Sequence, residues 1–246
     1  MLRQVVVVAA VIAGAAGFFG WRARAGVARP HYAVLVDRSQ SSFVSCAGLE
    51  AATARILGSR DVQRGSSMTL LATGDRSTAD EPRFVWSGAI PVNGRVFEGM
   101  TRRMDDRRRF IDGIAEQCRK ISPASSSPIF LGVKRALEQL RSLGCGRDSR
   151  CGLYVLSDGL ETADPLVRRA IASGARAAVV PLALPNAGVR ILFCGVAETQ
   201  AATTRASVAG VRAPEHADRL RAVWGAIFSD AEVVTFQPFC RGAEAD

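Results

Sequence analysis

The sequence predicts a doubly wound α/β fold, a mostly parallel sheet flanked by helices, with a hydrophobic helix at the N-terminus. Three observations predict it. Apolar runs of strand length alternate along the chain with segments of helical period. Several of these runs are nearly continuous Val, Leu and Ile, which is typical of parallel strands covered on both faces. The chain has 246 residues, of which 48% are hydrophobic, so a domain with a substantial core fits this length.

The first 28 residues are expected to form a membrane segment, and residues 29–242 the folded domain. Residues 5–21 carry no charge and reach roughly 25 Å as a helix, the short limit for spanning a bilayer. An uncleaved anchor is favoured over a signal peptide, because the small residues at 23–25 that resemble a cleavage site are interrupted by Arg24. Cleavage followed by secretion is the alternative.

The six cysteines favour an oxidising compartment for the domain. Their even number is compatible with three disulfides, and Cys145 and Cys151 bracket a short polar loop that a disulfide would close. The arginines that follow the apolar segment count against export of the C-terminal part. We expect the domain on the extracytoplasmic, periplasmic side of the membrane. Three cysteines have an alternative role as small buried hydrophobes, namely Cys46, Cys118 and Cys194.

Strands are expected in the apolar runs at 32–36, 68–72, 153–156, 190–196 and 233–236. A short antiparallel edge piece is expected from 83–88 and 94–99. Residues 176–184 fit either a strand or a buried connection.

Helices are expected where apolar residues recur at three- and four-residue steps, at 44–58, 107–121, 128–143, 164–173 and 214–228. Pro128 lies where a first helical turn tolerates proline. Ser42 is expected to cap the first of these helices, and Trp224 to lie in the core with Leu220 and Ile227.

The net charge of +9 does not by itself indicate a nucleic-acid partner. The densest basic run, residues 101–110, is interrupted by Asp105 and Asp106 and lacks interleaved aromatic side chains for stacking. We therefore expect this run to be a solvated surface and expect no nucleic-acid partner.

Polar oxygen-bearing residues follow the first and third predicted strands, where doubly wound sheets bind their ligands. Asp37, Ser39 and Ser41 come after the first strand, and Asp158 comes after 153–156. A serine run at 125–127 stands directly before a predicted helix. Two carboxylates with several neutral hydroxyls suit Mg²⁺ or Mn²⁺, whereas zinc would call for His or Cys ligands.

The order of these elements resembles the von Willebrand factor type A (VWA) domain, in a membrane-anchored form of bacterial type. The resemblance covers about residues 31–240 and rests on Asp37-x-Ser39-x-Ser41, a hydroxyl before Pro128, and Leu-Ser-Asp-Gly ending at 159. It implies a Rossmann-like VWA fold with a metal-ion-dependent adhesion site.

By this resemblance Asp37, Ser39 and Ser41 would be first-loop ligands, Ser127 would match the second-loop threonine, and Asp158 the third-loop aspartate. The family usually has Thr after a Gly pair in the second loop. This chain has a serine run there, and Ser126 could substitute in register for Ser127.

The chemistry and the resemblance together imply a binding protein and not an enzyme. A Mg²⁺ or Mn²⁺ ion would bridge the domain to an acidic residue of a protein partner, with no small-molecule substrate. One alternative is a structural component of a membrane complex that needs no metal. Another is a metal-dependent phosphohydrolase, although Ser39 stands where such enzymes need a second acid.

Overall fold

The computed structural model describes residues 29–39, 44–59, 62, 65–73, 81–91, 100–146, 149–174, 182, 184, 186, 188–195, 213–228 and 234–237. The expected membrane segment 1–28, the expected strand 94–99 and most of 176–184 lie outside these ranges. Within them, no helix combines the length and the apolar character that crossing a membrane requires.

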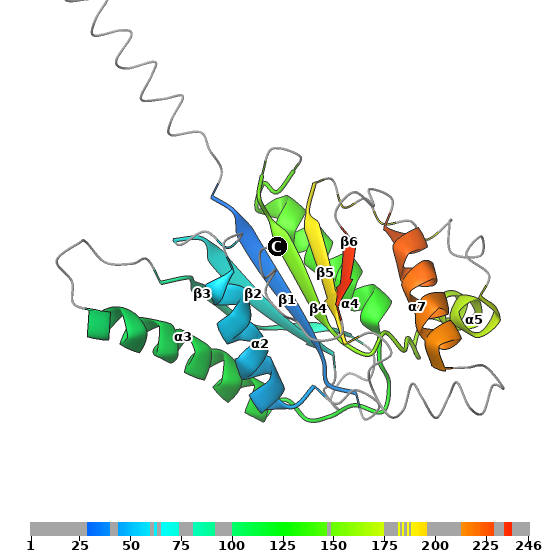
Figure 1. Cartoon of the computed structure of the whole chain (residues 1–246), viewed down its shortest axis with the longest axis horizontal. Helices are drawn as coiled ribbons and strands as arrows, with labels where there is room; N and C mark the ends of the chain where they lie inside the picture. Colours follow the sequence, from blue (N-terminus) through cyan, green and yellow to red (C-terminus); the bar gives the residue numbers. More distant parts are fainter. Residues whose placement is uncertain are drawn as a thin grey trace, which may run out of the picture.

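Six strands form one sheet in the order β3-β2-β1-β4-β5-β6 (Figure 1). Strand β3 is antiparallel to β2, and every other neighbouring pair is parallel. The order reverses between β1 and β4, which confirms a doubly wound sheet with its switch point there. The strands are β1 (His31–Asp37), β2 (Ser67–Thr73), β3 (Arg83–Ala89), β4 (Gly152–Leu156), β5 (Arg190–Cys194) and β6 (Val234–Gln237).

Helices cover both faces of the sheet, and the alternation of side chains along β1 shows how. Tyr32, Val34 and Val36 belong to a core cluster with α2 and α3, while Ala33 and Leu35 belong to a second cluster with α4, α5 and α7. Trp224 is buried in the second cluster, as the sequence predicted. The described helices are α2 (Cys46–Gly58), α3 (Met100–Lys120), α4 (Ile129–Ser142), α5 (Pro165–Ser173) and α7 (Ala213–Ile227).

Helix α4 packs closely on β1 because Gly132 has no side chain. A Cβ at this position would lie 2.8 Å from the Cδ1 atom of Leu35, whose side chain is buried. Gly132→Ala is therefore expected to lower the free energy of unfolding by about 1–3 kcal/mol through overpacking. Chemical denaturation checks this. Gly225→Ala in α7 is the control, since a Cβ there meets nothing within 4 Å, and equal stability of the two variants would contradict the close packing.

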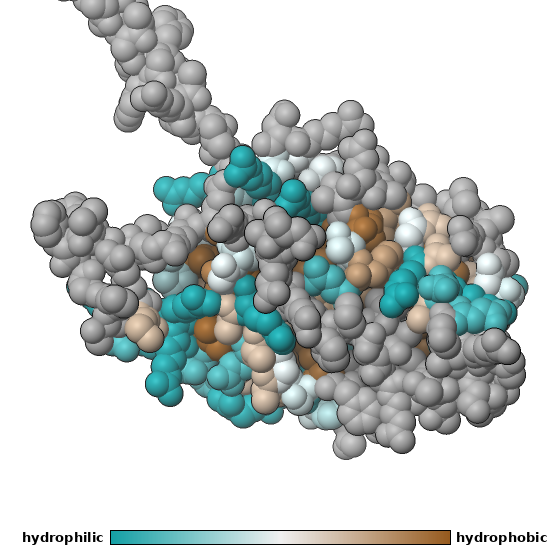
Figure 2. All heavy atoms as spheres, viewed as in Figure 1, coloured by the Kyte–Doolittle hydropathy of each residue, from teal (hydrophilic) through white to brown (hydrophobic). Residues whose placement is uncertain are grey.

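Helix α3 begins at Met100, seven residues before the helix predicted at 107–121. In its first turns Arg102, Met104, Asp105 and Arg107 are exposed, so these turns carry no apolar period for sequence reasoning to detect. Arg109 contacts Asp106 at 2.6 Å, and Arg108 contacts Asp112 at 3.9 Å. Hydrophilic residues gather over α2 and α3 on the face seen in Figure 2. Among the described side chains of the basic run the charged ones lie on the solvated side of the helix, and Phe110 at its end is buried in the core.

A disulfide between Cys46 and Cys118 joins the start of α2 to the end of α3. Cys194 is disulfide-bonded as well. The interpretation of Cys46, Cys118 and Cys194 as unpaired buried hydrophobes is therefore wrong. Helix periodicity could not distinguish a disulfide-bonded cysteine from an unpaired buried one, because both lie on the inward face of their helix. The cap of α2 also differs from the sequence prediction of Ser42, which lies outside the described residues. The N-cap is Ser45, whose hydroxyl accepts from the Gly48 backbone N–H at 3.0 Å.

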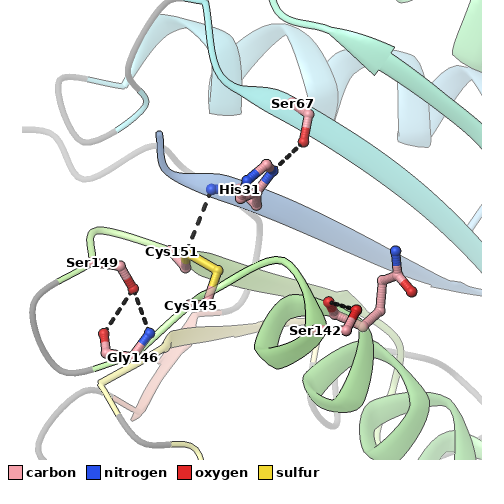
Figure 3. Close-up of a disulfide and its surroundings, with 8 residues drawn as sticks. His31, Ser67, Ser142, Cys145, Gly146, Ser149 and Cys151 are labelled. Carbon is pink, nitrogen blue, oxygen red and sulfur yellow. Dashed lines mark hydrogen bonds between the residues drawn. A yellow bond between two sulfur atoms is a disulfide. The ribbon is translucent and has the colours of Figure 1, made fainter. Parts of the chain in front are cut away.

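The predicted disulfide between Cys145 and Cys151 is present at the amino end of the sheet (Figure 3). It closes the turn between α4 and β4, and the Cys151 sulfur accepts from the His31 backbone N–H at 3.4 Å. The His31 ring hydrogen-bonds the Ser67 hydroxyl, which ties the starts of β1 and β2 together. None of the cysteines in the described ranges is free.

Candidate functional site

Asp37, the last residue of β1, is the buried centre of a hydrogen-bond network. Its Oδ1 atom accepts from the Ser39 backbone N–H at 2.9 Å and from the Thr73 hydroxyl at 2.9 Å. Its Oδ2 atom accepts from the hydroxyls of Ser127 at 2.6 Å and Ser157 at 2.8 Å. Four donors therefore occupy the roughly four acceptor positions of an ionised carboxylate.

The parallel register explains why these groups meet. Asp37 pairs with Thr73 at the end of β2, and Val36 pairs with Leu156 at the end of β4, so Ser157 follows directly beside Asp37. Three neighbouring strands thus deliver their polar ends to the same edge of the sheet. This edge includes the switch point between β1 and β4, where doubly wound sheets bind ligands.

The second loop brings Ser127 to the site from the segment before α4. The Ala124 backbone N–H donates to the Arg38 carbonyl at 3.1 Å, and Ala124 forms an isolated parallel bridge with Ser39. Of the three serines at 125–127, Ser125 is exposed and Ser127 is fully buried. The hydroxyl that reaches Asp37 is that of Ser127, in the register that the resemblance implies.

The third loop places Asp158 just after β4, with its side chain buried. The Asp158 Oδ1 atom accepts from the Leu160 backbone N–H at 3.0 Å. Gly159 adopts a left-handed conformation with φ of 81°, a turn that glycine makes at little cost. Its carbonyl accepts from the Trp224 indole N–H at 2.9 Å, which anchors this loop to the core.

Hydrogen bonds also join the second and third loops. The Ser127 backbone N–H donates to the Thr162 hydroxyl at 2.6 Å, and the Phe130 backbone N–H donates to Glu161 at 2.7 Å. Burial raises the pKa of the Glu161 carboxyl above its ordinary value, while hydrogen bonds from the backbone N–H groups of Phe130, Asp164 and Ala163 act in the opposite direction.

Of the five residues predicted as metal ligands, the structure describes Asp37, Ser39, Ser127 and Asp158. All four are buried at this edge of the sheet, Asp37 as the last residue of β1 and the other three in the loops that meet there. Ser41 lies outside the described residues. The network shows direct contact of Asp37 with Ser39 and Ser127.

Sequence reasoning missed four further residues of this network. Ser157 is next to the predicted Asp158, and Thr73 ends a strand that neighbours β1, so both positions were within reach of the strand-end argument. Glu161 and Thr162 had no sequence signal of their own. Their role depends on a contact with α4 that only the folded chain creates.

The donor chemistry of these residues fits a hard divalent cation. The Ser127 hydroxyl donates its proton to Asp37, so the lone pairs of its oxygen stay available to a cation. Within the described residues no three His, Cys, Asp or Glu side chains cluster as a metal site. Ser39, Ser127 and Asp158 would hold Mg²⁺ or Mn²⁺, and Asp37 would orient the hydroxyl protons.

No protein-family model and no curated protein matches the sequence. Similar solved structures include the ArnB paralog VWA2 from Sulfolobus acidocaldarius, with 14% identity over 67% of this chain and a TM-score of 0.37. Others are a von Willebrand factor type A protein from Catenulispora acidiphila, with 13% identity over 85% and a TM-score of 0.40, and the conserved hypothetical protein BatB from Bacteroides thetaiotaomicron, with 13% identity over 85% and a TM-score of 0.38.

The matched region spans 34% and 38% of the first two of those chains and 89% of the third. Similarity at this level carries no argument about this chain. The strand order and the parallel register of the sheet themselves define the doubly wound fold.

Proposed function

We propose that this chain is a membrane-tethered domain that binds a protein partner through a Mg²⁺ or Mn²⁺ ion. The observation that carries the proposal is the contact between Asp37 and the Ser127 hydroxyl, buried at the switch point of the sheet. In this arrangement the serine oxygen presents its lone pairs to a cation while its proton is held by a carboxylate.

The few charges at the site favour a partner that supplies a carboxylate. Of the three proposed ligands only Asp158 is a carboxylate, so part of the charge of a divalent ion stays uncompensated. Mg²⁺ prefers oxygen ligands and retains water positions that another ligand fills. An Asp or Glu side chain of a partner protein matches that requirement. The ion would then bridge the two proteins.

The hydrogen bonds of Asp37 support binding over phosphohydrolysis. A carboxylate that attacks phosphorus needs a free oxygen, and both oxygens of Asp37 already accept two hydrogen bonds each. Ser39 also stands where such enzymes carry their second acid. Asp37 is therefore better suited to orienting hydroxyls than to attacking a substrate.

The disulfides Cys46–Cys118 and Cys145–Cys151 support an extracytoplasmic location for the domain. Cytosolic thiols are normally kept reduced, and structural disulfides form in oxidising compartments such as the periplasm. Together with the uncharged segment at 5–21, they favour a domain tethered to the outer face of a membrane.

Crosslinking capture with the full-length protein tests the proposal. We expect a partner to be captured in Mg²⁺ and lost in EDTA, and lost again in Ser127→Ala, which removes one ligand hydroxyl. Ser125→Ala is the matched control, because that serine is in the same loop and is exposed. Capture that is equal with Mg²⁺, with EDTA and in Ser127→Ala would overturn the metal bridge and favour a structural component that needs no metal.

A further inference from the structure

Three hydrogen bonds join the loop that follows β4 to the loop that precedes α4 and to the first turn of α4. The Ser127 backbone N–H donates to the Thr162 hydroxyl at 2.6 Å, and the Thr162 backbone N–H donates back to the Ser127 carbonyl at 3.2 Å. The third bond runs from the Phe130 backbone N–H to Glu161 Oε2 at 2.7 Å. Both the backbone N–H and the backbone carbonyl of Ser127 are thus hydrogen-bonded to Thr162.

The Glu161 carboxylate supplies the capping hydrogen bond that α4 lacks at its N-terminus. The helix begins after Pro128, which makes no side-chain capping hydrogen bond, so the first backbone N–H groups need an acceptor from elsewhere. Glu161, only 2% exposed, supplies it with Oε2, while its Oε1 accepts from the backbone N–H groups of Ala163 at 2.7 Å and Asp164 at 3.0 Å. One buried carboxylate therefore fixes both its own loop and the start of α4.

We infer that Glu161 and Thr162 are positioning residues that set the Ser127 hydroxyl relative to Asp158. Asp158 and Thr162 belong to the same short loop, which Trp224 anchors through Gly159. The hydrogen bonds between this loop and Ser127 therefore fix the position of the second-loop ligand Ser127 relative to the third-loop ligand Asp158. The inference rests on the proposed metal-binding function and identifies which residues outside the ligand set give the site its affinity.

A purely structural role for the two residues makes a different prediction. If Glu161 and Thr162 only secure the start of α4, their substitution lowers stability and leaves the metal affinity of the folded protein unchanged. If they position Ser127, metal affinity falls even in variants that fold normally. Residues that support metal ligands typically contribute 10–100-fold to affinity.

Calorimetric titration of the purified full-length protein with Mn²⁺ separates these outcomes. Thr162→Val keeps the side-chain volume and the Thr162 backbone N–H, and it removes only the acceptor for Ser127. We expect its Mn²⁺ affinity to fall about 10–100-fold, and Thr162→Ser, which restores the hydroxyl, to bind within about twofold of the wild type. Glu161→Gln, which places an amide N–H against one of the backbone donors, is expected to weaken Mn²⁺ binding over the same range.

Asp164→Ala is the matched control in the same loop. The Asp164 side chain caps α5 by accepting from the backbone N–H groups of Leu166 and Val167, each at 2.9 Å, and these bonds do not involve the second loop. This variant is expected to lower the melting temperature and to leave Mn²⁺ affinity within twofold of the wild type.

The possible failures are distinguishable. A wild-type protein that binds no Mn²⁺ overturns the proposed function and this inference with it. Wild-type binding together with unchanged affinity in folded Thr162→Val and Glu161→Gln overturns the positioning role alone. An equal loss of affinity in Asp164→Ala would also overturn it, because the effect would then follow general stability.

Discussion

Asp37→Asn is expected to reduce the affinity for Mg²⁺ or Mn²⁺ by about 100-fold while the protein stays folded. The amide oxygen can still accept from the Ser39 backbone N–H and the Thr73 hydroxyl, as Oδ1 does now. The amide NH₂ then faces Ser127 and Ser157, where Oδ2 now accepts two hydrogen bonds. Both hydroxyls must turn to accept from it, so their protons point elsewhere.

This reversal of the hydroxyl protons is what removes the cation site. A Ser127 oxygen that accepts from the amide has one lone pair fewer for a cation, and its own proton repels the ion. Calorimetric titration with Mn²⁺ measures the affinity, and thermal denaturation checks the fold. Asp164→Asn makes the same substitution at the α5 cap, and the affinity should not change there. Wild-type affinity in Asp37→Asn would show that Asp37 does not orient the ligands.

The disulfide between Cys46 and Cys118 is expected to contribute more stability than the one between Cys145 and Cys151. The first closes a sequence separation of 72 residues and the second a separation of 6. The chain-entropy model gives about 4 kcal/mol for the longer loop and about 2 kcal/mol for the shorter one, because a longer loop loses more freedom in the unfolded chain.

Paired alanine substitutions test this difference. The Cys46→Ala, Cys118→Ala protein should lose about 2 kcal/mol more of its free energy of unfolding than the Cys145→Ala, Cys151→Ala protein, by denaturant titration. Each pair serves as the control for the other, since both remove one disulfide. Equal losses would mean that native packing around the sulfur atoms, and not loop length, decides their contribution.

The fold was predictable from the sequence where burial is continuous. Strands β1 and β4 are covered by helices on both faces, so their sequences are almost uninterrupted apolar runs with limits within about one residue of those predicted. Helix α4 was equally clear, because a polar outer face leaves an apolar stripe with period 3.6. The first turns of α3 were missed because their described residues show no such apolar stripe.

The candidate site was predictable to the level of strand ends and no further. Asp37 and Asp158 were identified because a carboxylate after a buried strand has a known place in a doubly wound sheet. Thr73 also stands directly after a predicted strand and was within reach of the same reasoning, whereas Glu161 required the approach of the third loop to α4. Pairing of Cys46 with Cys118 likewise depends on the packing of two helices that are far apart in the chain.

The Cys46–Cys118 bond also changes the covalent path between the first two loops of the site. Ser39 lies seven residues before Cys46, and Ser127 lies nine residues after Cys118. Through the sulfur atoms the two loops are near neighbours, and residues 47–117, with β2 and β3 among them, form a side branch of that path. A protease cut within this branch leaves one molecule on a non-reducing gel and two fragments on a reducing gel, with the loops of Asp37 and Ser127 still covalently joined in the former.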